Sequence, residues 1–131
     1  MVTFLVTSIL PLYLIRMITH EDDVLSVELT GEGIEGVRKQ IAVGPRDGWQ
    51  DGYMRIFTVA KGGHTSMHSH PWWHVNYILE GEGQLYIDGV AHPVRKGSVD
   101  YIEAGKLHQF VNTGSGDFRF ICIVPPEGDH Y

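Results

Sequence analysis

The sequence has little cysteine, few cationic residues and no long uninterrupted hydrophobic run. Cys122 is the one cysteine in 131 residues, which excludes an intramolecular disulfide and fits a reducing compartment, so we expect a cytoplasmic protein. Ten Lys and Arg residues stand against 16 Asp and Glu, for a net charge of −6. They form no basic cluster, so the sequence argues against a nucleic-acid partner.

The most apolar stretch, residues 2–15, is interrupted by three hydroxyl residues and a proline. It is too short and too interrupted to span a membrane, and the flanks typical of a signal peptide are missing, so we expect no membrane partner. Two interpretations remain. Met17 is the physiological start, or residues 2–9 form a strand that pairs with a neighbouring subunit, because an exposed apolar strand needs a partner. Residues 1–35 are therefore predicted as an N-terminal extension. Within it, residues 18–35 are predicted as an irregular segment that leads into the barrel.

Short β-rich runs separated by turn signals occupy most of the remaining chain, and no stretch has helical periodicity. Gly44–Gly48 and Lys61–Gly63 are predicted as turns, and Asp88-Gly89 predicts a tight hairpin. The predicted strands are residues 37–43, 53–60, 64–70, 74–80, 84–87, 90–94, 98–102, 107–111 and 118–124. About ten short strands predict an all-β closed barrel or jelly roll. We expect one domain, with the barrel at 36–126 and a C-terminal tail at 127–131.

Four histidines stand where such a barrel can direct them toward one point. His68 and His70 would share one face of a strand, since strand side chains alternate. His74 begins the next apolar run after a Pro-Trp-Trp connection, and His108 begins another. Neutral imidazole is the commonest protein ligand for divalent transition metals, so the spacing predicts a metal site. The alternative is a metal-free barrel whose histidines are hydrogen-bonded.

Two motifs carry a family resemblance. The first consists of Gly62, His68, His70, His74 and Gly81, and the second of Gly97, Glu103, Gly105, His108 and Asn112. Both resemble the paired motifs of the cupin superfamily, with two departures. His74 stands where the first motif usually has a glutamate ligand, and Glu103 stands where the second has a proline. The four-histidine pattern is similar to that of small single-domain cupins, among which manganese-binding bacterial and archaeal proteins are known.

The resemblance implies a cupin double-stranded β-helix, which is a jelly-roll barrel, and a homodimer. It also implies that His68, His70, His74 and His108 bind a divalent transition metal, with manganese the first choice. Ligand type does not choose the metal, because imidazole also accepts iron, nickel, zinc, cobalt and copper. Four neutral ligands leave the whole charge of the ion in place, which favours Lewis acidity, the divalent state and attraction of an anionic ligand.

Four protein ligands on an octahedral ion leave two positions for a small-molecule substrate or a second reactant. We expect an oxidoreductase of the dioxygenase type acting on a small organic substrate. The alternatives are a metal-dependent isomerase or lyase acting on a sugar acid or another small carboxylate, and a non-catalytic module that binds a small molecule or metal. The sequence identifies no general base.

Strand alternation also predicts the wall of a substrate pocket. Phe110 lies two residues after His108, Ile78 four residues after His74, and an aromatic residue and a thiol share one face of the last strand. One tryptophan beside the ligands is expected to cover the pocket, and an arginine is expected either to hold a carboxylate or to form a surface salt bridge. The simpler interpretation of the apolar residues is barrel core. The predicted pocket residues are Arg55, Phe57, Trp73, Ile78, Phe110, Phe120 and Cys122.

Overall fold

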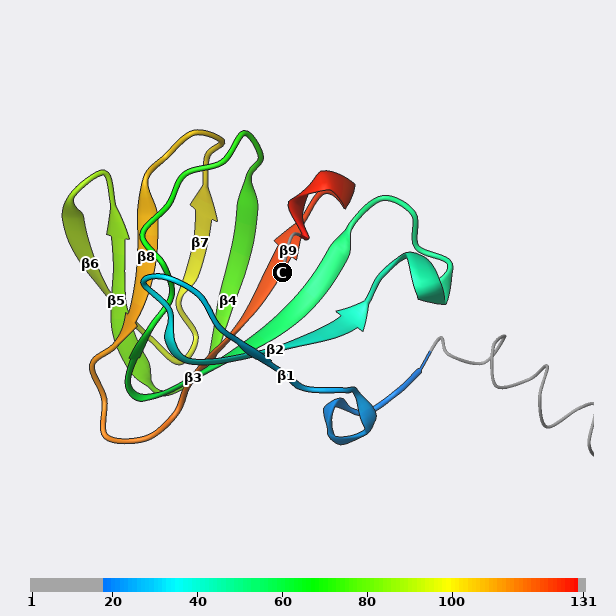
Figure 1. The fold of residues 1–131 in the computed structure, drawn as a ribbon, viewed down its shortest axis with the longest axis horizontal. Coiled ribbons are helices and arrows are strands. Elements are labelled where there is room, and N and C mark those ends of the chain that lie inside the picture. The colour runs from blue at the N-terminus through cyan, green and yellow to red at the C-terminus, as the bar shows by residue number, and fades with distance from the viewer. Residues whose placement is uncertain (1–17, 130–131) are drawn as a thin grey trace, which may run out of the picture.

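The computed structural model describes residues 18–129, which form one curled antiparallel sheet (Figure 1). The strands are β1 (Val27–Leu29), β2 (Glu35–Val43), β3 (Tyr53–His64), β4 (His74–Glu80), β5 (Glu82–Ile87), β6 (Val90–Arg95), β7 (Val99–Ile102), β8 (His108–Asn112) and β9 (Phe118–Val124). Three single-turn 3-10 helices, η1 (Glu21–Asp23), η2 (Pro45–Asp47) and η3 (Pro126–Gly128), complete the described elements. The expectations for residues 1–16 lie outside this range.

The strands pair in the order β6-β5-β8-β3-β9-β4-β7, with β2 added to β3 and β1 added to β2. Each strand pair is antiparallel. In the order from β6 to β7, every neighbouring pair except β6-β5 joins strands that are not consecutive in the chain. Such non-sequential antiparallel pairing lets a sheet roll around an enclosed core. The predicted all-β, single-domain jelly roll is confirmed.

The tightest turn of the barrel joins β5 to β6. Asp88 has φ 48° and Gly89 has φ 83°, and the flanking residues Ile87 and Val90 are register partners. Two consecutive residues with positive φ define the turn that matches the right-handed twist of a hairpin. The hairpin predicted from Asp88-Gly89 is therefore confirmed.

Three local predictions were wrong. The glycines predicted as a turn at 61–63 lie inside β3, where the register against β2 shifts between Glu35 and Val37, because glycine suits a bulge as well as a turn. Of the strand predicted at 64–70, His64 belongs to the end of β3, and residues 65–70 form no strand and contribute one isolated bridge, His68 to His108. The lead-in contains β1, because Leu29 packs against the core.

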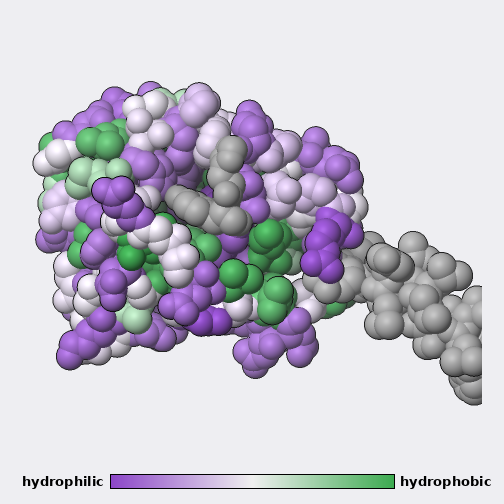
Figure 2. All heavy atoms as spheres, viewed as in Figure 1, coloured by the Kyte–Doolittle hydropathy of each residue, from purple (hydrophilic) through white to green (hydrophobic). Residues whose placement is uncertain are grey.

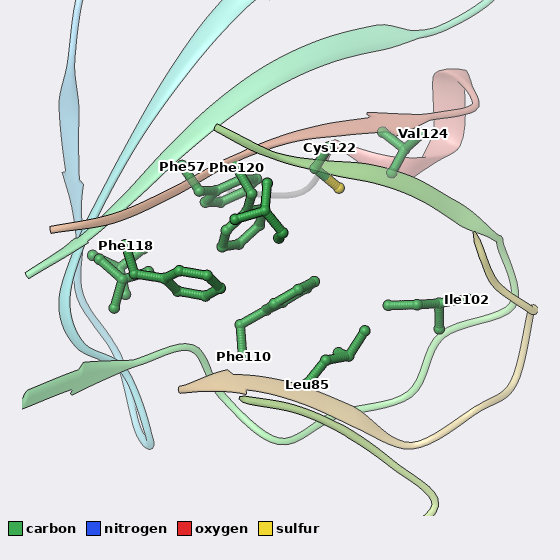
Figure 3. Close-up of a cluster of buried hydrophobic side chains, with 11 residues drawn as sticks. Phe57, Leu85, Ile102, Phe110, Phe118, Phe120, Cys122 and Val124 are labelled. Carbon is green, nitrogen blue, oxygen red and sulfur yellow. The ribbon is translucent and has the colours of Figure 1, made fainter. Parts of the chain in front are cut away.

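The interior is filled by side chains from every second residue of the strands. Along β9 the residues alternate between buried and half-buried over its whole length. Figure 3 shows Phe118, Phe120 and Cys122 of this strand directed into the same space as Phe57, Phe110 and Leu85 from other strands. Figure 2 shows hydrophobic residues gathered toward the middle of one face, with hydrophilic residues around them.

The outer face of β4 and β7 carries four large exposed apolar side chains, Val75, Tyr77, Val99 and Tyr101. They are register partners across the two strands, and β7 ends the order of the sheet. The homodimer stays a prediction. Between residues 18 and 129, no helix has the length and apolar character that a bilayer span requires.

Candidate metal centre and adjoining cavity

The backbone between β3 and β4 is held in place by hydrogen bonds to the segment around β8. The His68 amide donates to the His108 carbonyl at 3.1 Å, and the His108 amide donates to the His68 carbonyl at 2.9 Å. Nearby, the Gly105 amide donates to the His70 carbonyl at 2.8 Å. These bonds, rather than a regular strand, place the first two histidines of the motif beside His108.

The four imidazoles lie together at this end of the barrel. Ring nitrogens of His68, His70 and His108 all lie within 4.8 Å of one another. His74 stacks on His70 with a centroid distance of 4.6 Å and an interplanar angle of 5°, and their Nε2 atoms are 2.7 Å apart. The His108 ring stands edge-on to the other three, with centroid distances of 4.8, 4.9 and 4.8 Å to His68, His70 and His74.

Each of the four rings has a hydrogen-bond partner at Nδ1. His70 Nδ1 donates to the Trp72 carbonyl at 3.0 Å, and His108 Nδ1 donates to the Lys106 carbonyl at 2.8 Å. Because a carbonyl can only accept, both rings carry their proton on Nδ1 and keep a lone pair on Nε2. The Nδ1 atom of His68 contacts Ser66 Oγ at 2.6 Å, and that of His74 contacts Cys122 Sγ at 3.2 Å. Such contacts orient the histidine ligands of metals.

The histidines are neutral at physiological pH. Burial lowers the pKa of each, to about 4 for His68 and about 2 for His74, where the neighbouring rings lower it further. Within the described residues, the buried Nε2 of His108 has no hydrogen-bond partner, while the Nε2 atoms of His70 and His74 face each other. The ring nitrogens of His68, His70 and His108 are close enough together to share one ion, and His74 Nε2 lies beside that of His70. Neutral imidazoles grouped in this way can hold a divalent transition metal.

A cavity of about 220 Å³ adjoins the histidines. Its wall consists of Leu29, Ile34, Val37, Arg55, Phe57, Thr65, Ser66, His68, Ser69, His70, Trp72, His74, His108, Phe110, Phe120, Cys122 and Gly128. Phe120 stacks on Phe57 at 5.3 Å and on Phe110 at 4.1 Å between ring centroids. Away from the histidines the wall is therefore mainly apolar and aromatic.

Five of the seven predicted pocket residues, Arg55, Phe57, Phe110, Phe120 and Cys122, lie on this wall, and two do not. Trp73 is 36% exposed outside it, whereas Trp72 lines it and stacks on His70 at 4.3 Å. Ile78 is fully buried in the core opposite Phe120. The bend after Pro71, not strand alternation, decides which tryptophan faces the site.

Arg55 is 1% exposed and belongs to a buried charged group. Its Nη1 lies 3.4 Å from Asp129 Oδ1, and the same oxygen lies 2.9 Å from Lys39 Nζ. Its Nη2 donates to Cys122 Sγ at 3.0 Å, and burial raises the pKa of that thiol. Asp129 belongs to the predicted C-terminal tail. In the structure it forms ion pairs with Lys39 and Arg55, which are far from it in the sequence.

Sequence reasoning missed a second polar pair inside the barrel. Asn76 on β4 faces Asp100 on β7 in the register, and Asn76 is also the register partner of Cys122 on β9. Within residues 18–129, both carboxyl oxygens of Asp100 are buried without hydrogen-bond partners. The buried amide of Asn76 makes no hydrogen bond of standard geometry there and interacts with the Cys122 thiol. Burial raises the pKa of Asp100 to about 7. The sequence did offer one signal, because Asn76 lies two residues after His74 and so shares the inward face of the strand.

Comparisons with known proteins agree with the fold. An oxalate-binding protein of Thermotoga maritima is 31% identical over 74 residues, 53% of this chain and 61% of that protein. A 1-methylthio-D-xylulose 5-phosphate methylsulfurylase of Rhodospirillum rubrum is 30% identical over 78 residues, 60% of this chain and 50% of that protein. The chain thus matches about half to three fifths of these relatives' lengths.

Among solved structures, the polyketide cyclase RemF of Streptomyces resistomycificus superposes with a TM-score of 0.78 and 27% identity, covering 83% of this chain and 78% of that one. The cupin domain model matches residues 55–124. This match contains both histidine motifs and extends from Arg55 in β3 to the end of β9. Because it spans more than half of the sequence, the chain belongs to the cupin family.

Proposed function

We propose that the protein is a metal-dependent enzyme that acts on a small, largely apolar organic molecule. His68, His70, His74 and His108 would hold one divalent transition metal through their Nε2 atoms. The observation that carries this proposal is the buried Nε2 of His108, which has no hydrogen-bond partner among the described residues and lies amid three other imidazoles. Leaving such an atom without a partner is costly, and a cation removes the cost.

The donor set bears on the chemistry. All four ligands are neutral imidazoles with lowered pKa values, so none offsets the charge of the ion. When bound, a divalent cation of this kind supplies Lewis acidity toward a substrate carbonyl. Manganese is the metal that the family resemblance favours, and the other first-row divalent ions suit imidazole as well.

The residues around the histidines would hold and orient the substrate. The stacked rings of Phe57, Phe110 and Phe120 offer an apolar surface, and the indole of Trp72 covers His70. A buried apolar wall excludes water and strengthens electrostatic interactions at the reacting end of a substrate. The arrangement suits enolisation, isomerisation or ring closure of a carbonyl compound, and the likeness to a polyketide cyclase supports this class.

Oxidation of a small alkene or aromatic compound, the dioxygenase activity expected first, is the second candidate. The apolar wall favours it equally, because such substrates need no polar partner. Cys122 does not decide between the two, because its thiol lies 3.2 Å from the His74 ring but is buried with a raised pKa, which protects a thiol from oxidation. A sugar acid is less suited to the aromatic wall.

The proposal is tested with protein loaded with Zn(II), which is redox-silent, and separately with Mn(II). Enolisable aryl ketones are incubated in D₂O, and exchange at the α-carbon is followed by NMR, while oxygen consumption is recorded with Mn(II). We expect one metal ion per chain and exchange with either metal, both absent in a variant carrying His70→Ala and His74→Ala. Oxygen-dependent turnover with Mn(II) alone would favour the second candidate. Binding of metal and ligand without turnover would indicate a non-catalytic module, and failure to bind metal would refute the proposal.

A further inference from the structure

Arg55 is a buried cation with weak partners. Its guanidinium offers five N–H donors, yet Nε has no hydrogen-bond partner among the described residues. Nη1 reaches Asp129 Oδ1 at 3.4 Å and the Gly128 carbonyl at 3.5 Å, beyond the usual range of about 2.7–3.2 Å for such bonds. The shortest contact, 3.0 Å from Nη2, goes to the sulfur of Cys122. Within residues 18–129, the capacity of this group for oxygen acceptors is largely unused.

Asp129 does not supply the missing partner. Its Oδ1 lies closer to Lys39 Nζ, at 2.9 Å, than to Arg55, at 3.4 Å, so one carboxylate is shared between two cations. Arg55 is 1% exposed and Lys39 is 4% exposed, which means that bulk water does not solvate either charge. A buried guanidinium needs close anionic partners to offset its loss of hydration.

Arg55 is one of the residues that line the cavity. Phe57 lines it as well, and the Cζ atom of Arg55 lies 5.0 Å from the centroid of that ring. Cys122 Sγ lies 3.0 Å from the guanidinium and 3.2 Å from His74 Nδ1. The Cys122 thiol therefore lies between Arg55 and His74, and all three residues line the same cavity.

We infer that Arg55 binds the carboxylate of a small organic acid whose apolar part rests on the aromatic wall of the cavity. This inference rests on the proposed function and names its substrate class. A planar guanidinium matches a carboxylate with two parallel hydrogen bonds, which a single ammonium group does not provide. The carbonyl or hydroxyl oxygen of the same acid would face the histidines. Arg55 is then the residue that selects acids over neutral analogues.

The test uses the full chain and two probes, benzoate and its neutral analogue benzamide, with binding measured by calorimetry at fixed ionic strength. Four proteins are compared, namely the wild type, Arg55→Gln, Arg55→Lys and the matched control Arg95→Gln, which removes an exposed arginine of β6. Each is measured with Zn(II) and after chelation. We expect benzoate to bind at least about tenfold more tightly than benzamide, and Arg55→Gln to remove that preference. Arg55→Lys should keep part of it, and Arg95→Gln all of it.

Four results would overturn the inference. The first is equal affinity of the wild type for benzoate and benzamide, which needs no variant. The second is unchanged benzoate affinity in Arg55→Gln. The third is benzoate binding that requires Zn(II) and ignores Arg55, which would place the carboxylate at the metal and leave the proposed function intact. Competition by chloride at equal concentration would also overturn it, since it would indicate a general anion site. Metal titration of Arg55→Gln should match the wild type.

Discussion

The two ends of the barrel treat buried polar groups in opposite ways. At the end formed by residues 112–118, the Asn112 amide donates to the Val59 and Gly116 carbonyls at 2.9 and 2.8 Å and accepts from the Gly114 amide at 2.9 Å. Near the histidines, Asn76 is as deeply buried, yet among residues 18–129 its amide makes no hydrogen bond of standard geometry and interacts with the thiol of Cys122. The first asparagine is part of the fold, and the second stands in a region whose polar groups are not satisfied within the fold.

This contrast extends to the neighbours of each asparagine. Phe118 is fully buried beside the Asn112 end and packs against Phe110 and Phe120. The histidine end instead gathers His108 Nε2, Arg55 Nε and the Asp100 carboxyl, none with a hydrogen-bond partner in the described part of the chain. Natural proteins leave polar groups unsatisfied mainly at functional sites. One end therefore satisfies its buried polar groups within the barrel, and the other leaves polar atoms without partners among the described residues, as the proposed function requires.

The largest expected effect is on metal binding at the histidine end. A variant with His70→Ala and His74→Ala removes two of four ligands and should lose more than about a hundredfold in affinity for Zn(II) or Mn(II), beyond the loss that an outer-shell change causes. Calorimetric titration measures it, with His92→Ala, an exposed histidine of β6, as the control. Near-normal affinity in the double variant would remove the distinction between the two ends.

At the opposite end, Phe118→Ala should lower the free energy of unfolding by about 3–5 kcal/mol, because it leaves a cavity under a fully buried ring. Denaturant unfolding of the metal-free protein measures this change. The remaining folded protein should bind metal with an affinity within about threefold of the wild type, a difference below 1 kcal/mol. A large loss of metal affinity with little loss of stability would reverse the assignment of roles.

Asp100 makes stability near the histidine end depend on pH. Burial raises its pKa from 3.8 to about 7, so between these values the folded state holds a proton that the unfolded state has lost, and stability falls as pH rises. The loss of unfolding free energy caused by ionising the buried Asp100 is complete above about pH 7. It is at most about 4 kcal/mol, because the pKa differs by about three units between the two states and each unit corresponds to about 1.4 kcal/mol.

Asp100→Asn should therefore be more stable than the wild type at pH 8 and lose that advantage at pH 4. Urea unfolding of metal-free protein at both values measures it. The histidines, whose pKa values are lowered, act in the opposite direction by weakening the fold in acid, but they do so equally in both proteins. Asp117→Asn, at an exposed position, serves as the control. A gain that is the same at pH 4 and pH 8 would contradict the role of ionisation.

The smallest expected effect concerns an orienting contact. Ser66 Oγ lies 2.6 Å from His68 Nδ1, so Ser66→Ala should weaken metal binding by about tenfold, at the lower end of the range for groups that orient ligands. Its unfolding free energy without metal should change by no more than about 0.5 kcal/mol. Loss of stability with unchanged metal affinity would make this serine a structural residue instead.

The sequence predicted the regular parts of the barrel well. β4 and β9 have the predicted bounds, because burial changes at every second residue along them. Gly62 misled, because glycine marks both turns and bulges. The sequence did not show which of the two adjacent tryptophans lines the cavity. The backbone bend after Pro71 turns Trp72 toward it, and two identical neighbouring residues give no sign of that bend.

The missed parts of the site depend on contacts between distant segments. Asp129 meets Lys39 across 90 positions, and no local pattern predicts such a pair. Asp100 acquires its burial and its raised pKa through its register against Asn76, which short strands do not fix in advance. By contrast, the histidines were predictable because each motif is a short stretch of sequence with fixed spacing. The family resemblance then implied that the two motifs meet at one site.

The central claim is that four imidazole Nε2 atoms meet at one point of the barrel interior. Anomalous diffraction from crystals of the full chain soaked in Mn(II), recorded at the manganese edge, tests it most directly. The account predicts one dominant peak per chain, bonded to Nε2 of His68, His70, His74 and His108. A peak elsewhere, no peak at all, or a peak that excludes any of these four rings would contradict it.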